Sequence, residues 1–292
     1  MCCVLVVGLW WASSDDPRAD IAALSDPGTY TDLLDRARDF LDTAVVLPDD
    51  VDGSGPGIVV LEPRRGGTAA SPQVGFEEAS SRLLDAVRVE RPDPSYGFAA
   101  VQDDGVSPVA WSPCRPIHYV VNADGAPAGF DAAVDAAFAE LSDLTGLVFV
   151  DDGATGEDPV GGREAYLPEQ YGDRWAPVLI AVAEDDEVPY LEGETAGVAY
   201  TYRVRGVSSG LWHLVTGSVF VDRDAFGLRS GTNRAPSWLG ILRHELGHLV
   251  GLNHVDDPGQ LMYPVTSTVR TYASGDRTGL ALLGQGACAP DV

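Results

Sequence analysis

Hydrophobic residues along the chain recur at two spacings, which separate predicted helices from predicted strands. Between residues 130 and 145, apolar side chains return every three or four positions, which predicts an amphipathic helix that Gly146 ends. A second helix is predicted to begin near Ser237 as its N-cap, with a core stripe of Leu239, Leu242, Leu246 and Leu249. The chain therefore contains at least two helices that can each cover a sheet.

Short runs rich in β-branched and aromatic residues predict strands at 117–121, 147–150, 178–182, 197–205 and 214–222. The last two runs are joined through Ser208, Ser209 and Gly210, which predicts a hairpin. The order is strand, long helix, several strands, then a second helix. We therefore expect an α+β fold with a mixed sheet rather than a doubly wound one.

The first third of the chain differs from the rest in composition and has few periodic patterns. Residues 13–95 are acidic and interrupted by glycine and proline, with helical patterns only at 33–41 and 83–87. No internal repeat is visible. We divide the chain into residues 1–12, an extension at 13–95 that is a linker, stalk or pro-region, and a compact domain at 96–292.

Residues 1–12 form an apolar run that is long enough for the core of a signal peptide and too short to span a membrane. The run lacks the usual basic stretch before it. Two interpretations stay open: it is the tail of a signal or membrane anchor whose start lies upstream, or it is a buried segment. We favour export, and expect a secreted or cell-surface protein that an N-terminal membrane tether could hold.

The cysteines support the same compartment. Cys114 and Cys288 are distant single residues, a pattern that fits a disulfide better than a zinc site, which favours close pairs. Two buried free thiols are the alternative. A disulfide implies an oxidising compartment.

The formal net charge of −25 argues against nucleic acid or anionic lipid as a partner. All basic side chains are arginine, and we attribute this composition to codon bias, with adaptation to high salt as the competing explanation.

Candidate chemistry is concentrated at residues 244–254, which read HELGHLVGLNH. On a helix, His244 and His248 lie one turn apart and project from one face, so both can bind one ion. A tetrahedral zinc site with an open position for water needs a third protein ligand. Gly251 can take a positive φ, end the helix and bring His254 to the same metal.

Glu245 is displaced around the helix from the ligands. We expect it to act as a general base that accepts a proton from zinc-bound water and passes it to the leaving amine. The two histidines with Glu245 are a moderately specific pattern, but the added glycine and third histidine make a chance arrangement improbable.

This segment, followed by Met262, closely resembles the metzincin zinc metallopeptidases, and the matrixins in particular. The resemblance implies that Met262 lies in a tight turn beneath the metal and forms an apolar base for the imidazoles. It also implies an upper subdomain of mixed sheet and two long helices, a small C-terminal subdomain, and a substrate cleft between them. The close match is confined to about 244–264.

The resemblance further implies that an edge strand binds an extended peptide in the antiparallel direction. The candidate strand is 197–202, with loop 266–272 as the specificity loop. The predicted substrate-binding residues are Gly197, Val198, Ala199, Tyr200, Tyr263, Pro264 and Val265.

Some residues depart from the matrixin pattern. Val255 stands where matrixins carry serine, and no cysteine switch precedes the domain. Matrixins also have a structural zinc site and calcium sites. The two remaining histidines, His118 and His213, lie in strand-like segments and are better explained as structural residues than as zinc ligands. Asp151, Asp152 and the run 184–187 are acidic enough for Ca²⁺, but solvated loop charge is the default interpretation.

We therefore expect a monomeric zinc endopeptidase that binds one catalytic Zn²⁺ and hydrolyses polypeptides. One alternative is a catalytically silent zinc-binding adhesion or interaction domain on the same scaffold; the intact Glu245 argues against it. A second alternative is an interaction module in which residues 13–95 do the work.

Overall fold

The computed structural model describes residues 44–45, 58–63, 71–226, 238–265 and 268–292. All of these belong to one of two compact units of the chain, Ala44–Val292. Its strands are β1 (Ala44–Val45), β2 (Ile58–Leu61), β3 (Gly97–Phe98), β4 (Ala110–Trp111), β5 (Ile117–Asn122), β6 (Phe149–Ala154), β7 (Val178–Ala183), β8 (Gly197–Arg205), β9 (Trp212–Asp222) and β10 (Leu252–Asn253). Its helices are α3 (Phe130–Thr145), α4 (Pro168–Tyr171), η1 (Pro189–Leu191), η2 (Arg223–Phe226), α5 (Trp238–Val250) and α6 (Ser274–Leu283).

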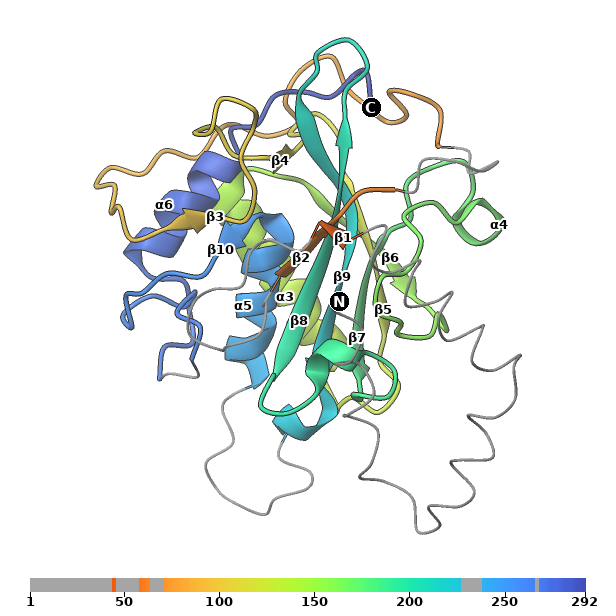
Figure 1. Ribbon diagram of the computed structural model, residues 1–292, viewed down its shortest axis with the longest axis vertical. Helices are drawn as coiled ribbons and strands as arrows, with labels where there is room; N and C mark the ends of the chain where they lie inside the picture. The colour runs from red at the N-terminus through yellow and green to blue at the C-terminus, as the bar shows by residue number, and fades with distance from the viewer. Residues whose placement is uncertain (1–43, 46–57, 64–70, 227–237, 266–267) are drawn as a thin grey trace, which may run out of the picture. The chain divides into compact units, whose positions relative to one another are not determined.

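The main sheet is mixed, as predicted. Its strands follow the order β1-β2-β8-β9-β7-β5-β6, and β4 also pairs with β9. Strands β6, β5, β7 and β9 are parallel neighbours, whereas β8 runs antiparallel to β9 in the predicted hairpin. A separate small sheet pairs β3 with β10. The α+β class with a mixed sheet is therefore confirmed (Figure 1).

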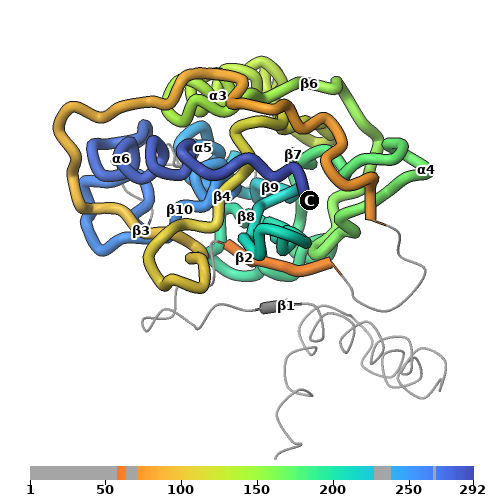
Figure 2. Tube along the Cα trace, turned by 90° about the horizontal axis from the view of Figure 1, so that it is seen from above, coloured from red at the N-terminus to blue at the C-terminus, as the bar shows by residue number. Residues whose placement is uncertain are grey.

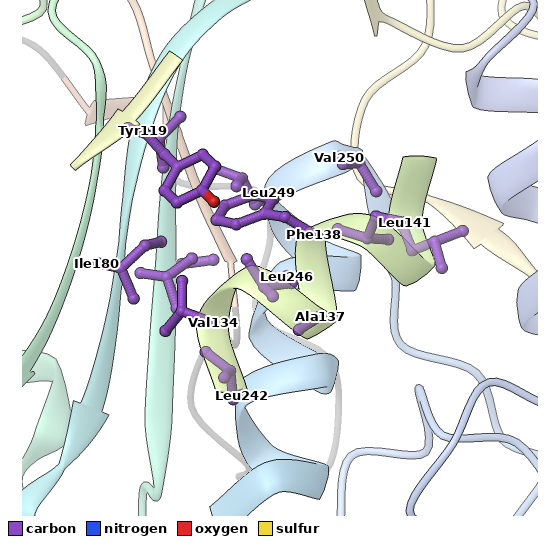
Figure 3. Close-up of a cluster of buried hydrophobic side chains, with 14 of the residues drawn as sticks. Tyr119, Val134, Ala137, Phe138, Leu141, Ile180, Leu242, Leu246, Leu249 and Val250 are labelled. Carbon is purple, nitrogen blue, oxygen red and sulfur yellow. The ribbon is translucent and has the colours of Figure 1, made fainter. Parts of the chain in front are cut away.

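Helices α3 and α5 cover one face of this sheet, and α6 packs against both helices (Figure 2). Leu242, Leu246 and Leu249 of α5 are completely buried, which confirms most of the predicted leucine stripe. From α3, Phe138 stacks on Tyr119 of the sheet with ring centroids 4.1 Å apart (Figure 3). Apolar burial between helices and sheet thus holds α5 in place.

The boundaries of the predicted helices agree closely with the structure. Helix α3 ends at Gly146, whose φ of 71° is the left-handed conformation that glycine adopts readily. Helix α5 is described from Trp238, so the predicted N-cap Ser237 lies outside the described residues. The first strand of the hairpin matches its prediction, and the second begins two residues early.

The prediction of a helix at 83–87 is wrong, because the structure has no helix there. The backbone of this region bonds to another segment instead: Leu83 N donates to Pro113 O, and Ala79 N donates to Cys114 O. Leu84 is 44% exposed, so its side chain does not contribute to a buried helical face. The pattern at 33–41 and residues 1–12 lie outside the described residues.

Part of the predicted extension contributes to the sheet, since β2 comes from residues 13–95. The boundary at residue 95 stays a prediction. The predicted disulfide between Cys114 and Cys288 is present, with Cα atoms 5.3 Å apart. Among the described helices, none has the length and apolar character that a membrane crossing requires.

Candidate metal centre

Helix α5 places its leucines and its polar side chains on different sides. The leucine stripe packs into the core, while His244 and His248 project one turn apart on another face. His248 is completely buried, and His244 is partly buried. The helix therefore presents two imidazoles from a rigid, well-packed element.

Gly251 brings the third histidine round, as predicted. Its φ of 114° is unfavourable for a residue with a Cβ atom, and its N–H donates to His248 O at the end of α5. The chain then forms β10, which pairs with β3, and His254 follows directly. Pairing between two short strands thus fixes the position of a ligand that lies outside the helix.

The three imidazoles converge on one point. The Nε2 atoms of His244, His248 and His254 lie 3.1 Å from one another in every pair. A tetrahedral zinc ion with bonds of about 2.0–2.1 Å separates its ligand nitrogens by about 3.3 Å. The spacing of the three nitrogens therefore suits a shared zinc ion.

The outer nitrogens of the rings determine which inner nitrogens can bind a metal. Nδ1 of His244 donates to Leu261 O at 2.7 Å, and Nδ1 of His248 donates to Leu252 O at 2.9 Å. A neutral imidazole with its proton on Nδ1 has its lone pair on Nε2. Two lone pairs thus face a common point. A bound cation would stabilise this arrangement.

Burial keeps these rings neutral. It lowers the pKa of His244 to about 4, and repulsion from His254 contributes in the same direction. Burial also lowers the pKa of His248 well below its ordinary value. Neutral imidazole is the form that binds a metal, so the environment prepares the ligands.

Glu245 lies beside the ligands and is only 4% exposed. Its Oε2 atom is buried and has no hydrogen-bond partner among the described residues. Burial raises the pKa of this carboxyl well above its ordinary value, and a bound divalent ion would act in the opposite direction. An unpartnered buried carboxylate oxygen next to three metal-binding nitrogens suits a water or substrate atom between them.

Strand β8 approaches this carboxylate closely. A Cβ atom on residue 197 would lie 2.7 Å from Cγ of Glu245, so only glycine fits at this position. The first residue of the predicted peptide-binding strand is therefore adjacent to the predicted general base.

Met262 packs against α5 at Gly247, where the absence of a side chain leaves room for the methionine sulfur. It is 1% exposed, and a Cβ atom on Gly247 would lie 2.7 Å from its sulfur. Its carbonyl accepts a hydrogen bond from Val255 N, which closes the loop between the third histidine and the methionine. The role of Gly247 was not predicted, although a glycine inside a helix is a recognisable signal of close packing.

A buried carboxylate anchors the methionine turn, and sequence reasoning missed it. Asp276 is 1% exposed and accepts hydrogen bonds from the backbone N–H groups of Leu261, Met262 and Ala273. The carbonyl of Leu261 in turn holds the ring of His244. An aspartate in the first turn of a helix is a signal that could have revealed Asp276. The helix concerned, α6, was itself not predicted.

The predicted substrate-binding residues fall in two places. Gly197–Tyr200 belong to β8, whose outer edge is paired with β2, so β8 is not an edge strand of the described sheet. Tyr263 and Pro264 are half-buried, and Val265 is 57% exposed. Their contacts with a peptide stay a prediction.

Of the predicted specificity loop, residues 266–267 lie outside the described residues. Tyr272 at its end is buried and donates to Arg243 O at 2.6 Å. This tyrosine is therefore a structural anchor of α5.

Of the other candidate ligands, His118 has ordinary partners, whereas Nε2 of His213 has no hydrogen-bond partner among the described residues. His118 lies 2.8 Å from Asp152 and 3.2 Å from Glu77, and Asp152 also binds Arg174. His213 is buried within the sheet. Among the described residues, the groups able to hold a metal are the three histidines and Glu78 with Cys114 and Cys288, whose sulfurs form the disulfide. Calcium binding is not supported.

Comparison with known families now adds to this geometry. The family model described as matrixin matches residues 182–280, which run from the end of β7 into α6. This part of the chain is matrixin-like. The predicted resemblance is therefore confirmed, and a metalloprotease-type domain with an implied zinc ion follows from it. No curated protein matches the chain.

Proposed function

We propose that the protein is a zinc-dependent endopeptidase. The observation that carries this proposal is the triangle of three Nε2 atoms beside the buried, unpartnered Oε2 of Glu245. The matrixin match supports the same class of reaction. A silent zinc-binding domain would need the ligands but not the carboxylate.

The residues divide the chemistry between them. His244, His248 and His254 would hold the ion through Nε2, and the ion supplies Lewis acidity and lowers the pKa of a bound water to about 7. Glu245 would accept a proton at Oε2 from the water molecule whose oxygen forms a bond to the carbonyl carbon of the peptide. It would then donate that proton to the amide nitrogen as the bond between this nitrogen and the carbonyl carbon breaks. Burial of this carboxyl strengthens its attraction for the proton.

The strand next to the base supports a polypeptide substrate. An extended polypeptide would bind along β8 by main-chain hydrogen bonds in place of β2, which pairs with Ala199–Tyr202, and would have Tyr263, Pro264 and Val265 beside the residue after the cleaved bond. We also propose that the protein acts outside the cell as a monomer, secreted or tethered to the surface. The disulfide of Cys114 and Cys288 supports an oxidising compartment.

The test compares casein cleavage by three preparations of the full chain: zinc-loaded, treated with a chelator, and carrying Glu245→Gln. We expect the chelator to abolish cleavage and added zinc to restore it. Loss of a general base should lower the rate by about 100-fold or more while the zinc content stays at one equivalent. Cleavage that survives either change would overturn the mechanism.

A further inference from the structure

A cavity lies at the end of the sheet that is remote from the metal centre. Its lining includes Ile117, the first residue of β5, and His213 near the start of β9. Gly197, which abuts Glu245, pairs with Val221 at the other end of β9. The strand between His213 and Val221 spans about 26 Å at the usual rise of about 3.3 Å per residue. The cavity is therefore separate from the candidate metal centre.

The cavity is small, largely apolar and open to solvent. The centres of water-sized groups have about 40 Å³ of free space in it, which is enough for about three such groups. Its size suits the end of a small molecule rather than a whole one. The apolar lining includes Trp111, Ile117, Val178, Leu214 and Val215.

Two further aromatic side chains lie at the opening. Phe76 is 38% exposed and Trp175 is half-buried, and both line the cavity. Aromatic rings at such a position offer a broad apolar surface to the part of a ligand that stays outside. A molecule with a small head and an apolar body could therefore contact the interior and the opening together.

The wall of the cavity is held in place by covalent and hydrogen bonds. Cys288 is joined to Cys114, and Arg115 donates to the carbonyls of Ala289 and Val292. Figure 1 shows this end of the chain next to the tip of the β8–β9 hairpin, to which it is hydrogen-bonded. A wall that is already formed lowers the entropic cost of binding a ligand.

One polar atom of the lining is left without a partner. His213 is 3% exposed, and its Nε2 atom is buried with no hydrogen-bond partner among the described residues. A buried nitrogen in this state is unfavourable, and a hydrogen-bonding group in the cavity would stabilise it. The ligand should therefore carry one polar group at its inner end.

The charged side chains of the lining already have partners. Arg115 and Arg174 each bind a carboxylate of the protein, and Glu77 lies 3.2 Å from Nε2 of His118. An anionic or a cationic ligand would have to compete with these pairs. A neutral polar group would not, which favours an uncharged ligand.

The imidazole of His213 is itself neutral. Burial lowers its pKa, and this effect outweighs the attraction of Asp291 and Glu78, which raises the pKa. In a neutral imidazole one nitrogen donates and the other accepts, and the tautomer decides which role Nε2 takes. A hydroxyl group suits both tautomers, because it can donate as well as accept.

We propose that this cavity binds the hydroxyl end of a small apolar alcohol, with the hydroxyl hydrogen-bonded to Nε2 of His213 and the apolar body against Phe76 and Trp175. The chemical class is a neutral, amphipathic molecule such as an aromatic alcohol. This second binding site does not depend on the endopeptidase function, and its failure would leave that function standing.

The test is a titration of the full chain with benzyl alcohol, followed through the NMR signals of the His213 ring and the Ile117 methyl groups. We expect saturable shifts with a dissociation constant of about 1 mM, which is ordinary for so small a ligand. Toluene is the matched control, because it lacks only the hydroxyl. It should bind about fivefold more weakly, since Nε2 stays without a partner.

Two charged analogues test the neutral character of the site. Benzoate and benzylamine should each bind more weakly than benzyl alcohol, and tighter binding of either would overturn the proposed ligand class. Shifts that stay linear with benzyl alcohol, without saturation, would mean that the cavity holds water only. That result would overturn the proposal.

His213→Leu assigns the polar contact. In this variant benzyl alcohol should lose its advantage, so that it and toluene bind with about equal affinity. His118→Leu is the matched control: His118 also lines the cavity but is bound to carboxylates, so the fivefold preference should remain. An unchanged preference in His213→Leu would overturn the proposal.

A second variant covers the case in which His213→Leu fails to fold, as judged by circular dichroism. Phe76→Ala changes a partly exposed side chain, and it should weaken benzyl alcohol and toluene by a similar factor of about three. Nuclear Overhauser effects between the benzyl ring and Trp175 give a direct readout in the intact chain. Their absence at saturation, or an unchanged affinity in Phe76→Ala, would overturn the proposal.

Discussion

Residues 238–292 and residues 58–95 of this protein differ in how their roles are encoded. The first region carries three histidines, a glutamate and a methionine within one short stretch, positioned by a single helix and the turns after it. The second region has no chemical motif, yet it supplies β2 to the strand beside Glu245 and a buried carboxylate, Glu78, to the disulfide end of the domain. The metal ligands therefore lie in one region, while the other contributes a strand and a buried carboxylate to the fold around them.

The comparison shows that residue spacing along the chain reveals a metal site but not the strands that pack beside it. The histidine ligands are close in sequence, so helix geometry alone brings two of them together. β2 and β8 are far apart in sequence, and only the folded chain shows that they pair. Substitutions in the two regions should therefore differ in what they change.

The largest effect is expected from His248→Ala. Removal of one of three ligands should reduce zinc affinity by more than the roughly 10–100-fold that loss of an outer partner costs. Casein cleavage should disappear with the metal. Zinc content by atomic absorption after dialysis checks this. His118→Ala is the matched control, because His118 is paired with acidic side chains rather than with the other histidines. This variant should retain one equivalent of zinc. Full zinc content in His248→Ala would contradict the site.

A smaller effect on the metal is expected from Asp276→Ala. Three backbone N–H groups lose their acceptor, which should cost about 3 kcal/mol or more in the free energy of unfolding. Because Leu261 O orients His244, zinc affinity should also fall by about 10–100-fold. Urea unfolding and zinc titration measure the two quantities. Asp256→Ala, at an exposed position, should change neither, and an unchanged affinity in Asp276→Ala would remove its positioning role.

In the other region, Glu78→Ala should change stability without changing the zinc affinity. Glu78 lies 3.1 Å from Arg115 and accepts hydrogen bonds from Ser112 and Ala289, so its loss removes the carboxylate partner of a half-buried arginine. Arg115 keeps its hydrogen bonds to Ala289 O and Val292 O, so the cost should be about 1–3 kcal/mol in the free energy of unfolding.

Leu84→Ser in the same region should cost less than about 0.5 kcal/mol, because Leu84 is exposed. Urea unfolding compares the two variants. A large loss in Leu84→Ser would contradict the exposed position of Leu84.

Much of the fold could be predicted from periodic patterns. α3, α5 and the β8–β9 hairpin have strong local signals, because each repeats one apolar spacing over many residues. α6 was missed, since it is short and contains Gly275 and Gly279, which lower its helical signal. The pattern at 83–87 failed for the opposite reason, because its backbone bonds to residues 113–114 rather than to itself.

The site was predicted as far as its residues are local. The three histidines converge as expected, and Gly251 takes the positive φ that was expected. The roles of Glu245 and Met262 stay predictions. Asp276, Gly247 and β2 could not be found in this way, because the function of each depends on a partner brought close by folding.

The most direct test of the central claim is anomalous diffraction at the zinc absorption edge from crystals of the zinc-loaded chain. The account predicts one strong peak equidistant from the Nε2 atoms of His244, His248 and His254, at about 2.0–2.1 Å from each. It also predicts that Glu245 is not a ligand. A peak bonded to carboxylates, or bound zinc with no peak among these three nitrogens, would contradict the account.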